Sequence, residues 1–332
     1  MKFDMISASP IENLLEHSLA QQIKDRALEM GFSLVGIAPA QPSPRRQYLK
    51  DWLDQGRAGE MAYLARRFEE RVDPAAYLPG AASVICVAMN YYYPLEEDTA
   101  SSHPARVARY ALGDDYHEMI KDRLFCLADW IRQKAPESQT RCGVDTAPIM
   151  EKDLAMRAGI GWIGKNSCLI NPRIGSWLLL GEIITTLALP ADEPETDHCG
   201  TCRACIDACP THAITAPYEL DATRCISYLT IEHRGAIDQS LQEQMGDWLY
   251  GCDICQEVCP HNRKAAPATD PQFLPRFPSG TMDAKQVLDW DAATYQLTLR
   301  GSAMKRVKLP MLQRNAQIVL NNERAAQADP SK

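Results

Sequence analysis

The first half of the chain alternates between segments with helical spacing of apolar residues and segments that are apolar throughout. Within 11–30, apolar residues recur every three or four positions and Gly31 follows, which is the pattern of a helix and its C-terminal stop. The next run, 32–38, is short and apolar, as in a buried strand. The same features predict mainly helical structure over 45–78, a strand over 82–91, a helix over 117–134, and a strand pair or one long strand over 176–189. This alternation predicts an α/β layer structure up to about residue 190.

The second half of the chain has a different pattern. A polar stretch broken by prolines, 190–197, predicts a boundary. The segment 218–250 looks partly helical, the proline-rich 265–281 reads as a linker, and the tail from Asp283 reads as helices. We therefore expect an α/β domain over 1–190, a second module over 191–266, and a linker with a short helical segment over 267–332.

Size and composition are those of an ordinary globular protein. The chain has 332 residues, of which 45% are hydrophobic and 23% charged. Its N-terminus has no apolar run typical of a signal peptide, and the most apolar stretch, 177–190, is interrupted by Glu182 and too short to span a bilayer. These features predict a cytoplasmic monomer without membrane contact.

Twelve cysteines give the strongest chemical signal. Residues 199–210 read Cys-x-x-Cys-x-x-Cys-x-x-x-Cys-Pro, and residues 252–260 read Cys-x-x-Cys-x-x-x-Cys-Pro. Two-residue spacers let one tight loop hold three corners of a 4Fe–4S cluster, while the fourth cysteine ligates the other cluster of a two-cluster ferredoxin. This crossover predicts one cluster held by Cys199, Cys202, Cys205 and Cys259, and a second held by Cys209, Cys225, Cys252 and Cys255.

Other interpretations of the cysteines fit less well. Structural zinc usually takes two separated pairs of ligands rather than three cysteines in seven residues with a second copy. A disulfide framework is typical of small secreted chains. We interpret Cys86, Cys126, Cys142 and Cys168, which lie outside both motifs, as small buried apolar residues.

The net charge of −8 argues mildly against a nucleic-acid partner. It conceals two basic groups, however. One comprises Arg300, Lys305, Arg306, Lys308 and Arg314, and the other comprises His261, Arg263 and Lys264. Taken alone, they are more typical of solvated helix faces and loops.

Three short motifs outside the cysteine runs are candidate sites. Gly159–Gly164 matches G-x-G-x-x-G with Glu182 further on, but a helical segment precedes it where a nicotinamide fingerprint needs a strand. We therefore interpret it as a loop that brings backbone against some ligand. Asp115-Tyr116-His117 resembles a cobalamin D-x-H-x-x-G motif that fails at Ile120, and it suits a helix N-terminus capped by Asp115. Asp145 lies in a turn, as a capping residue or as a positioned general acid.

Together these pieces resemble one family, the epoxyqueuosine reductases of queuosine biosynthesis. The resemblance rests on the cysteine runs and on the segments 108–117, 144–148, 158–166, 175–176, 180–183, 225–232, 301–306 and 314–316. It implies an α/β (α+β) cobalamin-binding domain similar to reductive dehalogenases, a ferredoxin-like two-cluster module and a short C-terminal helical segment. Longer members carry further C-terminal helical repeats, so part of the tRNA-binding surface is expected to be smaller here.

The resemblance also implies an activity and its residues. The implied reaction is reduction of epoxyqueuosine to queuosine at the wobble position of tRNA, with electrons from an unidentified donor passing through two clusters to cobalamin. Asp145 is the implied proton donor, with a raised pKa in an apolar pocket. The implied cofactor contacts are Tyr116, His117, Lys165, Asn166, Ser227 and Tyr228. Another cobalamin and iron–sulfur reductase, such as a dehalogenase, is the alternative, although a dehalogenase would normally carry an export signal. A protein that only transfers electrons would not need the large α/β domain.

Overall fold

The computed structural model describes residues 18–98 and 101–328, and its first part is built on a four-stranded antiparallel sheet. The strands are β1 (Leu34–Pro39), β2 (Ser83–Asn90), β7 (Leu178–Thr185) and β4 (Thr140–Gly143), in the order β1-β2-β7-β4. Every neighbouring pair is antiparallel. The segment 176–189 therefore contains one long strand at the centre of the sheet.

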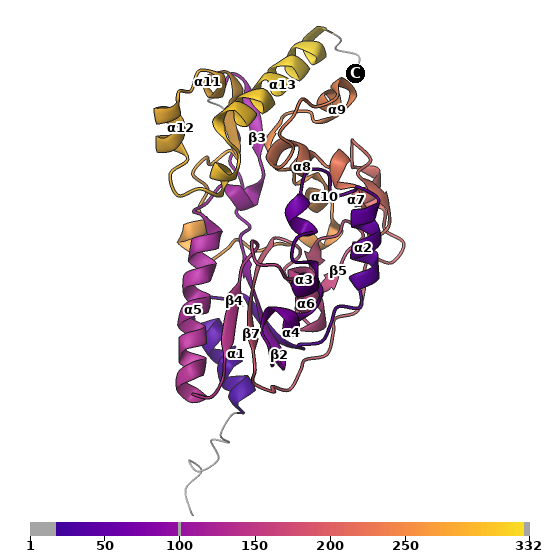
Figure 1. Cartoon of the computed structure of the whole chain (residues 1–332). Helices are drawn as coiled ribbons and strands as arrows, with labels where there is room; N and C mark the ends of the chain where they lie inside the picture. Colours follow the sequence, from indigo (N-terminus) through magenta and orange to yellow (C-terminus); the bar gives the residue numbers. More distant parts are fainter. Residues whose placement is uncertain (1–17, 99–100, 329–332) are drawn as a thin grey trace, which may run out of the picture.

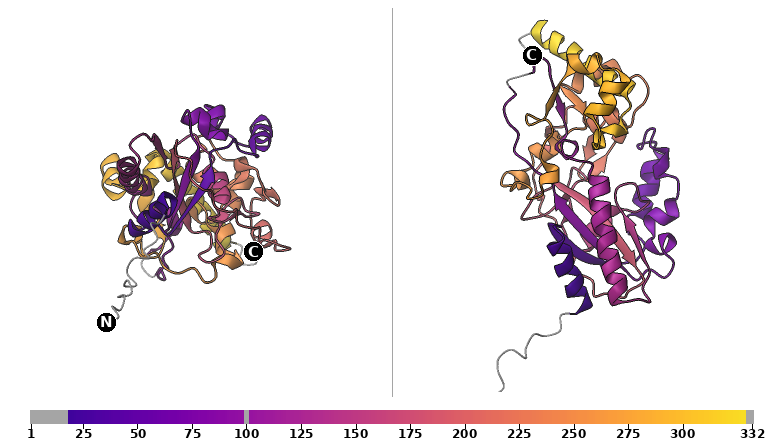
Figure 2. Two further views of the ribbon diagram at one scale, coloured as in Figure 1. Left: turned by 90° about the horizontal axis from the view of Figure 1, so that it is seen from below. Right: turned by 90° about the vertical axis from the view of Figure 1, so that its left-hand side faces the viewer.

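Helices cover both faces of this sheet, as the two-residue period of β2 requires. Ile85, Val87 and Met89 pack with α1 (Leu19–Glu29) and α5 (Tyr116–Lys134) on one face. Val84 and Cys86 pack with α6 (Glu151–Arg157) on the other. Figure 1 shows α1 and α5 side by side along the sheet, and the side view in Figure 2 agrees. The mixed α/β layers predicted for this part are confirmed.

Two of the predicted helices differ in extent. The segment 45–78 contains four short pieces, which are α2 (Arg46–Asp54), η1 (Ala62–Leu64), α3 (Phe68–Val72) and α4 (Pro74–Tyr77). Pro74 begins the last of them because its missing N–H is not needed in a first helical turn. Of the helix predicted over 11–30, residues 11–17 lie outside the described part of the chain, and the rest is α1.

The cysteine-rich module consists of short elements. They are α7 (Ala204–Asp207), β8 (Ile214–Ala216), β9 (Glu219–Leu220), η3 (Ala222–Arg224), α8 (Ile226–Ile231), α9 (Gln239–Gln244), β10 (Trp248–Tyr250), α10 (Ile254–Glu257) and η4 (Pro260–Asn262). The short helices α7 and α10, which begin within the two cysteine runs, lie against one another. A hairpin of β5 (Trp162–Ile163) and β6 (Leu169–Ile170) lies beside the first run.

A second core forms near the C-terminus. Strand β3 (Pro104–Val107) pairs parallel to β10 and antiparallel to β11 (Thr281–Asp283). Around it pack α11 (Ala284–Leu288), α12 (Ala292–Thr298), η6 (Ala303–Arg306) and α13 (Leu309–Ala328). η5 (Pro271–Phe273) and η2 (Arg109–Ala111) complete the connections. This core draws residues from all three segments predicted from the sequence, and in Figure 1 it lies at the end opposite α1.

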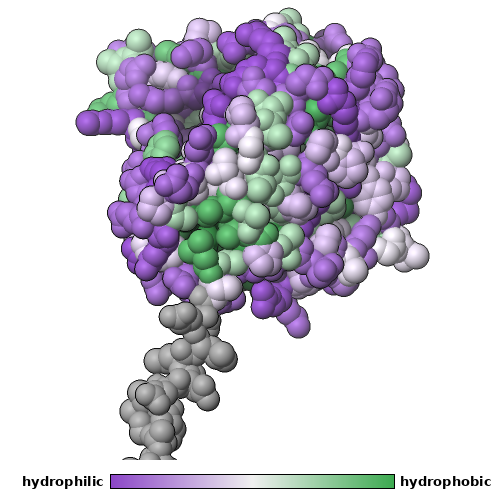
Figure 3. All heavy atoms as spheres, turned by 60° about the horizontal axis from the view of Figure 1, so that its bottom comes forward, coloured by the Kyte–Doolittle hydropathy of each residue, from purple (hydrophilic) through white to green (hydrophobic). Residues whose placement is uncertain are grey.

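Figure 3 shows a face that is mostly hydrophilic with a compact hydrophobic area near its middle. Among the described residues, no helix is both long and apolar enough to cross a bilayer.

Candidate active site

A cleft of about 1270 Å³ lies where the sheet domain, the cysteine module and the C-terminal helices meet. It is larger than the roughly 300–1,000 Å³ of most small-molecule sites. Its lining includes Tyr63, Tyr110, Asp115, Tyr116, His117, Asp145, Cys168, Cys225, Ser227, Tyr228, Glu232, Lys305 and Arg306. The cleft thus gathers acids, aromatic rings, cations and a motif cysteine from distant parts of the chain.

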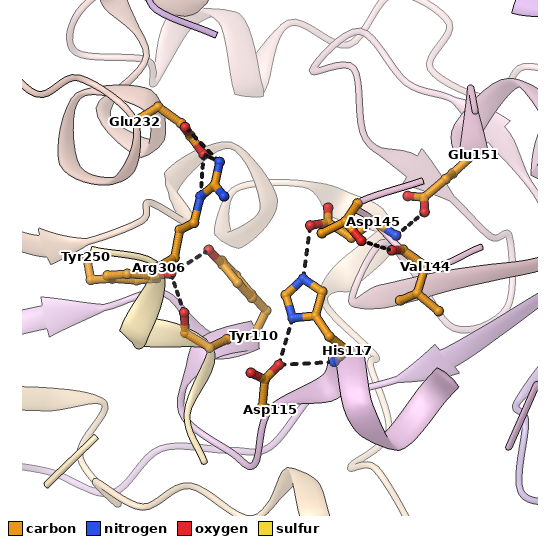
Figure 4. A network of polar contacts seen from close by, with 11 residues as sticks. Tyr110, Asp115, His117, Val144, Asp145, Glu151, Glu232, Tyr250 and Arg306 are labelled. Carbon is orange, nitrogen blue, oxygen red and sulfur yellow. Dashed lines mark hydrogen bonds and ion pairs between the residues drawn. The ribbon is translucent and has the colours of Figure 1, made fainter. Parts of the chain in front are cut away.

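His117 is the centre of a polar network on one wall of the cleft (Figure 4). Asp115 caps α5 by accepting the backbone N–H of His117 at 3.1 Å, and its Oδ1 atom lies 2.7 Å from the Nδ1 atom of the ring. The Nε2 atom lies 2.9 Å from Oδ2 of Asp145. Burial opposes the charged ring, but hydrogen bonds to the two carboxylates outweigh it and raise the pKa of His117 to about 9. His117 is therefore an imidazolium between two acids at neutral pH.

Asp145 lies on the loop that follows β4 and does not sit in an apolar pocket. Its side chain is 54% exposed, and its backbone has a left-handed φ of 47°. The backbone N–H of Asp145 donates to Oε1 of Glu151 at the start of α6. Tyr116 is buried, and its ring stacks on His117 with 4.0 Å between the centroids. The expected apolar surroundings of Asp145 are thus wrong for the free protein, because the aspartate faces an open cleft.

Two further carboxyl groups, the half-buried Glu151 and the buried Glu182, act electrostatically on one another near Asp145, and the sequence interpretation did not assign them to the site. Burial and the charge of Asp145 raise the pKa of Glu151 to about 8. Glu182 has no exposed surface, and neither of its side-chain oxygens has a hydrogen-bond partner among the described residues. Burial and then the charge of Glu151 raise its pKa well above the usual range. The available signal was a lone glutamate inside an apolar strand.

The first predicted set of cysteines is gathered around a small cavity. Cys199, Cys202, Cys205 and Cys259 all line it. Burial, and then the thiols of Cys199, Cys259 and Cys202, raise the pKa of Cys205 to about 11. Burial likewise raises the pKa of Cys259. Four sulfur atoms around one small cavity are the ligand set that a 4Fe–4S cluster needs.

The second predicted set is also brought together. Cys225 and Cys209 lie close enough to Cys252 to interact electrostatically with its thiol. Cys252 and Cys225 interact with the thiol of Cys255 in the same way. Cys168 hydrogen-bonds to Cys255, so it is more than the small core residue that we expected. Cys168 and Cys225 both line the large cleft, whereas no cysteine of the first set does. The second group is therefore the one beside the cleft.

Lys165 and Asn166 do not lie where the resemblance suggested. Both line the small cavity of the first cysteine group rather than the large cleft. Asn166 donates from Nδ2 to the carbonyl oxygen of Cys255 at 3.3 Å. Ser227 and Tyr228 do line the large cleft, and the buried hydroxyl of Tyr228 accepts the backbone N–H of Glu60 at 2.8 Å.

The glycine motif before Lys165 serves internal packing. A Cβ atom on Gly161 would lie 2.2 Å from the carbonyl oxygen of Ile170 in the paired strand. On Gly159, which has a φ of 72°, it would lie 2.5 Å from the carbonyl oxygen of Glu193. Gly159 and Gly161 therefore admit neighbouring backbone of the chain itself and not the ligand that we expected, although Lys165 and Asn166 after them line the small cavity of the first cysteine group.

The basic groups are only partly free. Arg314 donates to the carbonyl oxygens of Leu229, His233 and Gly235, so its role is structural. Arg306 pairs with Glu232 at 2.9 Å on the cleft wall opposite His117 in Figure 4. Arg300 and Lys308 are exposed, and Lys305 lines the cleft.

Comparison with known proteins agrees with this geometry. Residues 198–262 match a family described as "4Fe-4S double cluster binding domain", and residues 71–146 match "Epoxyqueuosine reductase QueG, DUF1730". The epoxyqueuosine reductase of Leadbetterella byssophila is 43% identical over 90% of this chain and 98% of its own length. That of Escherichia coli K12 is 42% identical over 92% of this chain and 82% of its own length.

Solved structures give the same result. An epoxyqueuosine reductase crystallised with an epoxyqueuosine-modified tRNA stem loop superimposes with a TM-score of 0.85 and 30% identity, over 93% of this chain and 83% of that one. The enzyme from Bacillus subtilis, solved with an aspartate catalytic loop swung out of its active site, gives 0.84 and 29% over the same shares.

Proposed function

This chain belongs to the epoxyqueuosine reductase family, and from that premise we propose that it reduces epoxyqueuosine to queuosine at the wobble position of tRNA. The observation that carries the proposal is the large cleft. One wall holds the Asp115–His117–Asp145 network, another holds Cys225 and Cys168 from the second cysteine group, and Lys305 and Arg306 line it as well. A proton source, an electron source and cations for a phosphate backbone thus share one space. We place this activity in the cytoplasm, where tRNA is found, and in a monomer.

We assign the eight motif cysteines to two 4Fe–4S clusters with the crossover described above. The small cavity lined by one cysteine set supports the first site, and the mutual proximity of the other set supports the second. Because only the second set borders the cleft, electrons would travel from the first cluster to the second and then to the cleft.

The volume and lining of the cleft fit cobalamin, a cofactor larger than most small-molecule ligands. Ser227 and Tyr228 on one side and Tyr116 and His117 on the other are the residues that would hold it. When bound, cobalamin supplies a low-valent cobalt centre able to deliver electrons to a carbon–oxygen bond.

The residues of this chain supply the first proton of the reaction, and water in the open cleft supplies the second. Removal of an epoxide oxygen as water takes two electrons and two protons and leaves a carbon–carbon double bond. The proton on Nε2 of His117 faces Oδ2 of Asp145 at 2.9 Å, so one transfer converts that carboxylate into an acid able to protonate the departing oxygen. Asp115, 2.7 Å from Nδ1, fixes the orientation of the ring during this transfer.

The proposal is tested with the purified protein. After anaerobic loading with iron, sulfide and cobalamin, it is incubated with a one-electron chemical reductant and an anticodon stem loop that carries epoxyqueuosine. Nucleoside digestion and mass spectrometry should show queuosine, and protein loaded without cobalamin should give none. Epoxyqueuosine left unchanged by fully loaded, reduced protein would overturn the proposed activity.

A further inference from the structure

The motif Gly159–Asn166 lies beside the first cysteine group, and the proposed reaction gives it no role. We propose that Lys165 and Trp162 of this motif raise the reduction potential of the first 4Fe–4S cluster, so that it accepts electrons more readily from the donor. The inference rests on the cluster assignment of the proposed function. It gives a different role to Lys165, which the family resemblance placed among the cobalamin contacts.

Lys165 is a buried cation whose ammonium is held by backbone carbonyl oxygens. Its residue is 9% exposed, and it lines the same small cavity as Cys199, Cys202, Cys205 and Cys259. Its Nζ atom donates to the carbonyl oxygens of Gly200 at 2.5 Å and Cys202 at 2.9 Å. Within the described ranges no carboxylate lies at ion-pair distance from this ammonium. Asp197 is the carboxylate whose pKa the charge of Lys165 helps to lower.

A buried ammonium is costly to leave unpaired. The cavity next to Lys165 is the place where a cluster with four thiolate ligands, an anion, would lie. The added electron makes that anion more negative, and a nearby positive charge in a poorly solvated site stabilises the reduced form more than the oxidised form. Lys165 therefore acts in the direction of a higher potential.

Trp162 acts in the same direction through a hydrogen bond. Its indole Nε1–H donates to Sγ of Cys199 at 3.4 Å. The ring is 2% exposed and is held edge-to-face against His198 and His261, with 4.9 Å between ring centroids in each case. Hydrogen bonds to cluster sulfurs are one of the means by which proteins set cluster potentials. The N–H is fixed by packing on both sides of the ring, so this donor is preorganised.

The position of the first cluster in the electron path explains why Lys165 and Trp162 would affect electron transfer. The first cysteine group does not border the large cleft, whereas the second does. The first cluster is thus the one that a donor protein would reduce. Raising its potential increases the reduced fraction at any given donor potential.

The test is a redox titration of the loaded holoprotein, followed by EPR spectroscopy, which distinguishes the two clusters. Lys165→Met removes the charge, Lys165→Arg keeps it, and Trp162→Phe keeps the ring but removes the N–H. Lys264→Met is the matched control, because Lys264 is an exposed lysine close to Cys259 in sequence. Iron and sulfide content is measured for every variant.

We expect Lys165→Met to shift the equilibrium of the first cluster toward the oxidised form at least about tenfold, which corresponds to about 59 mV for a one-electron couple. Trp162→Phe should shift it the same way by less, while Lys165→Arg and Lys264→Met should stay near the wild type. The second cluster should change less than the first in each variant.

Two results would overturn the inference. One is an unchanged first-cluster potential in Lys165→Met with full iron content, and the other is an equal fall in Lys165→Arg. If Lys165→Met did not hold its first cluster, Trp162→Phe would decide, since an unchanged potential there contradicts the inference and a lower one supports it. The potentials do not depend on turnover, so loss of epoxyqueuosine reduction with normal potentials would count against the proposed function alone.

Discussion

The Nε2 atom of His117 lies 2.9 Å from Oδ2 of Asp145, although His117 lies in the first turn of α5 and Asp145 lies on a loop 28 residues later. A second carboxylate, from Asp115, holds the far side of the ring. In the reaction that we propose, the proton for the departing oxygen therefore belongs to this pair of residues. Several measurable consequences come from this pair and from the surroundings of the cleft.

Replacing Asp145 by asparagine keeps the shape of the side chain and removes its ability to release a proton. We expect intact clusters and bound cobalamin, with turnover at least about 100-fold lower, as for loss of a general acid. Single-turnover assays with the modified stem loop measure the effect. Near-normal turnover at neutral pH would remove Asp145 from the mechanism.

The raised pKa of His117 predicts a pH dependence. Because this pKa is about 9 in the folded protein against an ordinary value near 6.5, the proton is held throughout the neutral range. Turnover should fall as pH rises through about 9, and the contribution of His117 to stability, fully present below about 6.5, should be lost over the same rise. His117→Gln should be slow at all pH values and should lack this limb. An unchanged alkaline limb in His117→Gln would assign it to another group.

The buried carboxyl group of Glu182 predicts a second pH-dependent contribution to stability, in which the folded state favours the uncharged side chain. Its raised pKa means that the folded state favours the neutral carboxyl, so its stability contribution is present at low pH and is lost as pH rises above about 4.5. Glu182→Gln, which is neutral throughout, should be more stable than the wild type at pH 8 by at least about 1 kcal/mol. At pH 5 the gap should be much smaller. Denaturant unfolding of the holoprotein at both pH values gives the comparison, and a pH-independent difference would count against a buried neutral acid.

The crossover of cluster ligands is tested with Cys209→Ala. We expect damage to the cluster of Cys225, Cys252 and Cys255, since the thiol of Cys209 lies among theirs. Iron analysis and EPR spectroscopy measure the loss. The neighbouring cluster of Cys199, Cys202 and Cys205 should survive, and its selective disappearance would reverse the assignment.

Binding of tRNA should depend on the cations near the cleft. Alanine at Lys305, Arg306 and Lys308 together should raise the KM for tRNA and flatten the salt dependence of binding, because fewer counterions are released from the phosphates. Filter binding over a range of salt concentrations measures both. Arg314 is left unchanged because it supports the backbone of 229–235.

The matched control for the cation variant replaces Lys50, Arg132 and Lys134, which are exposed on α2 and α5. If tRNA binding had the same salt dependence in the wild type and in the variant at Lys305, Arg306 and Lys308, those side chains would be solvated charges that do not contact tRNA. Cluster spectra and cobalamin occupancy should not change in either variant.

What could be predicted from the sequence had a local cause. The cysteine spacing reflects the reach of one loop. The continuous apolar run of β2 reflects burial on both faces of the sheet, and the helical period of α5 reflects its one packed face. The cap by Asp115 follows from its place before a helix. Each of these needs only a few neighbouring residues.

What could not be predicted depends on contacts between distant segments. The residues next to Lys165 in the sequence do not indicate that its ammonium donates to the carbonyl oxygens of Gly200 and Cys202. The contact of Glu151 with the backbone of Asp145 depends on how the intervening turn closes. In the sequence Arg314 resembles a surface cation. In the structure its guanidinium donates hydrogen bonds to the backbone of α8 and of the loop that follows it.

The pairing of β3 with β10 and β11 has a consequence for the order in which the molecule is made. Strand β3 leaves the ribosome long before β10 and β11, the strands that complete its sheet. The upper wall of the cleft, including Lys305 and Arg306, is built last, after both cysteine runs have been synthesised. During synthesis the cleft therefore lacks this wall until the last part of the chain has been made, so the site is complete only after the C-terminal core has folded.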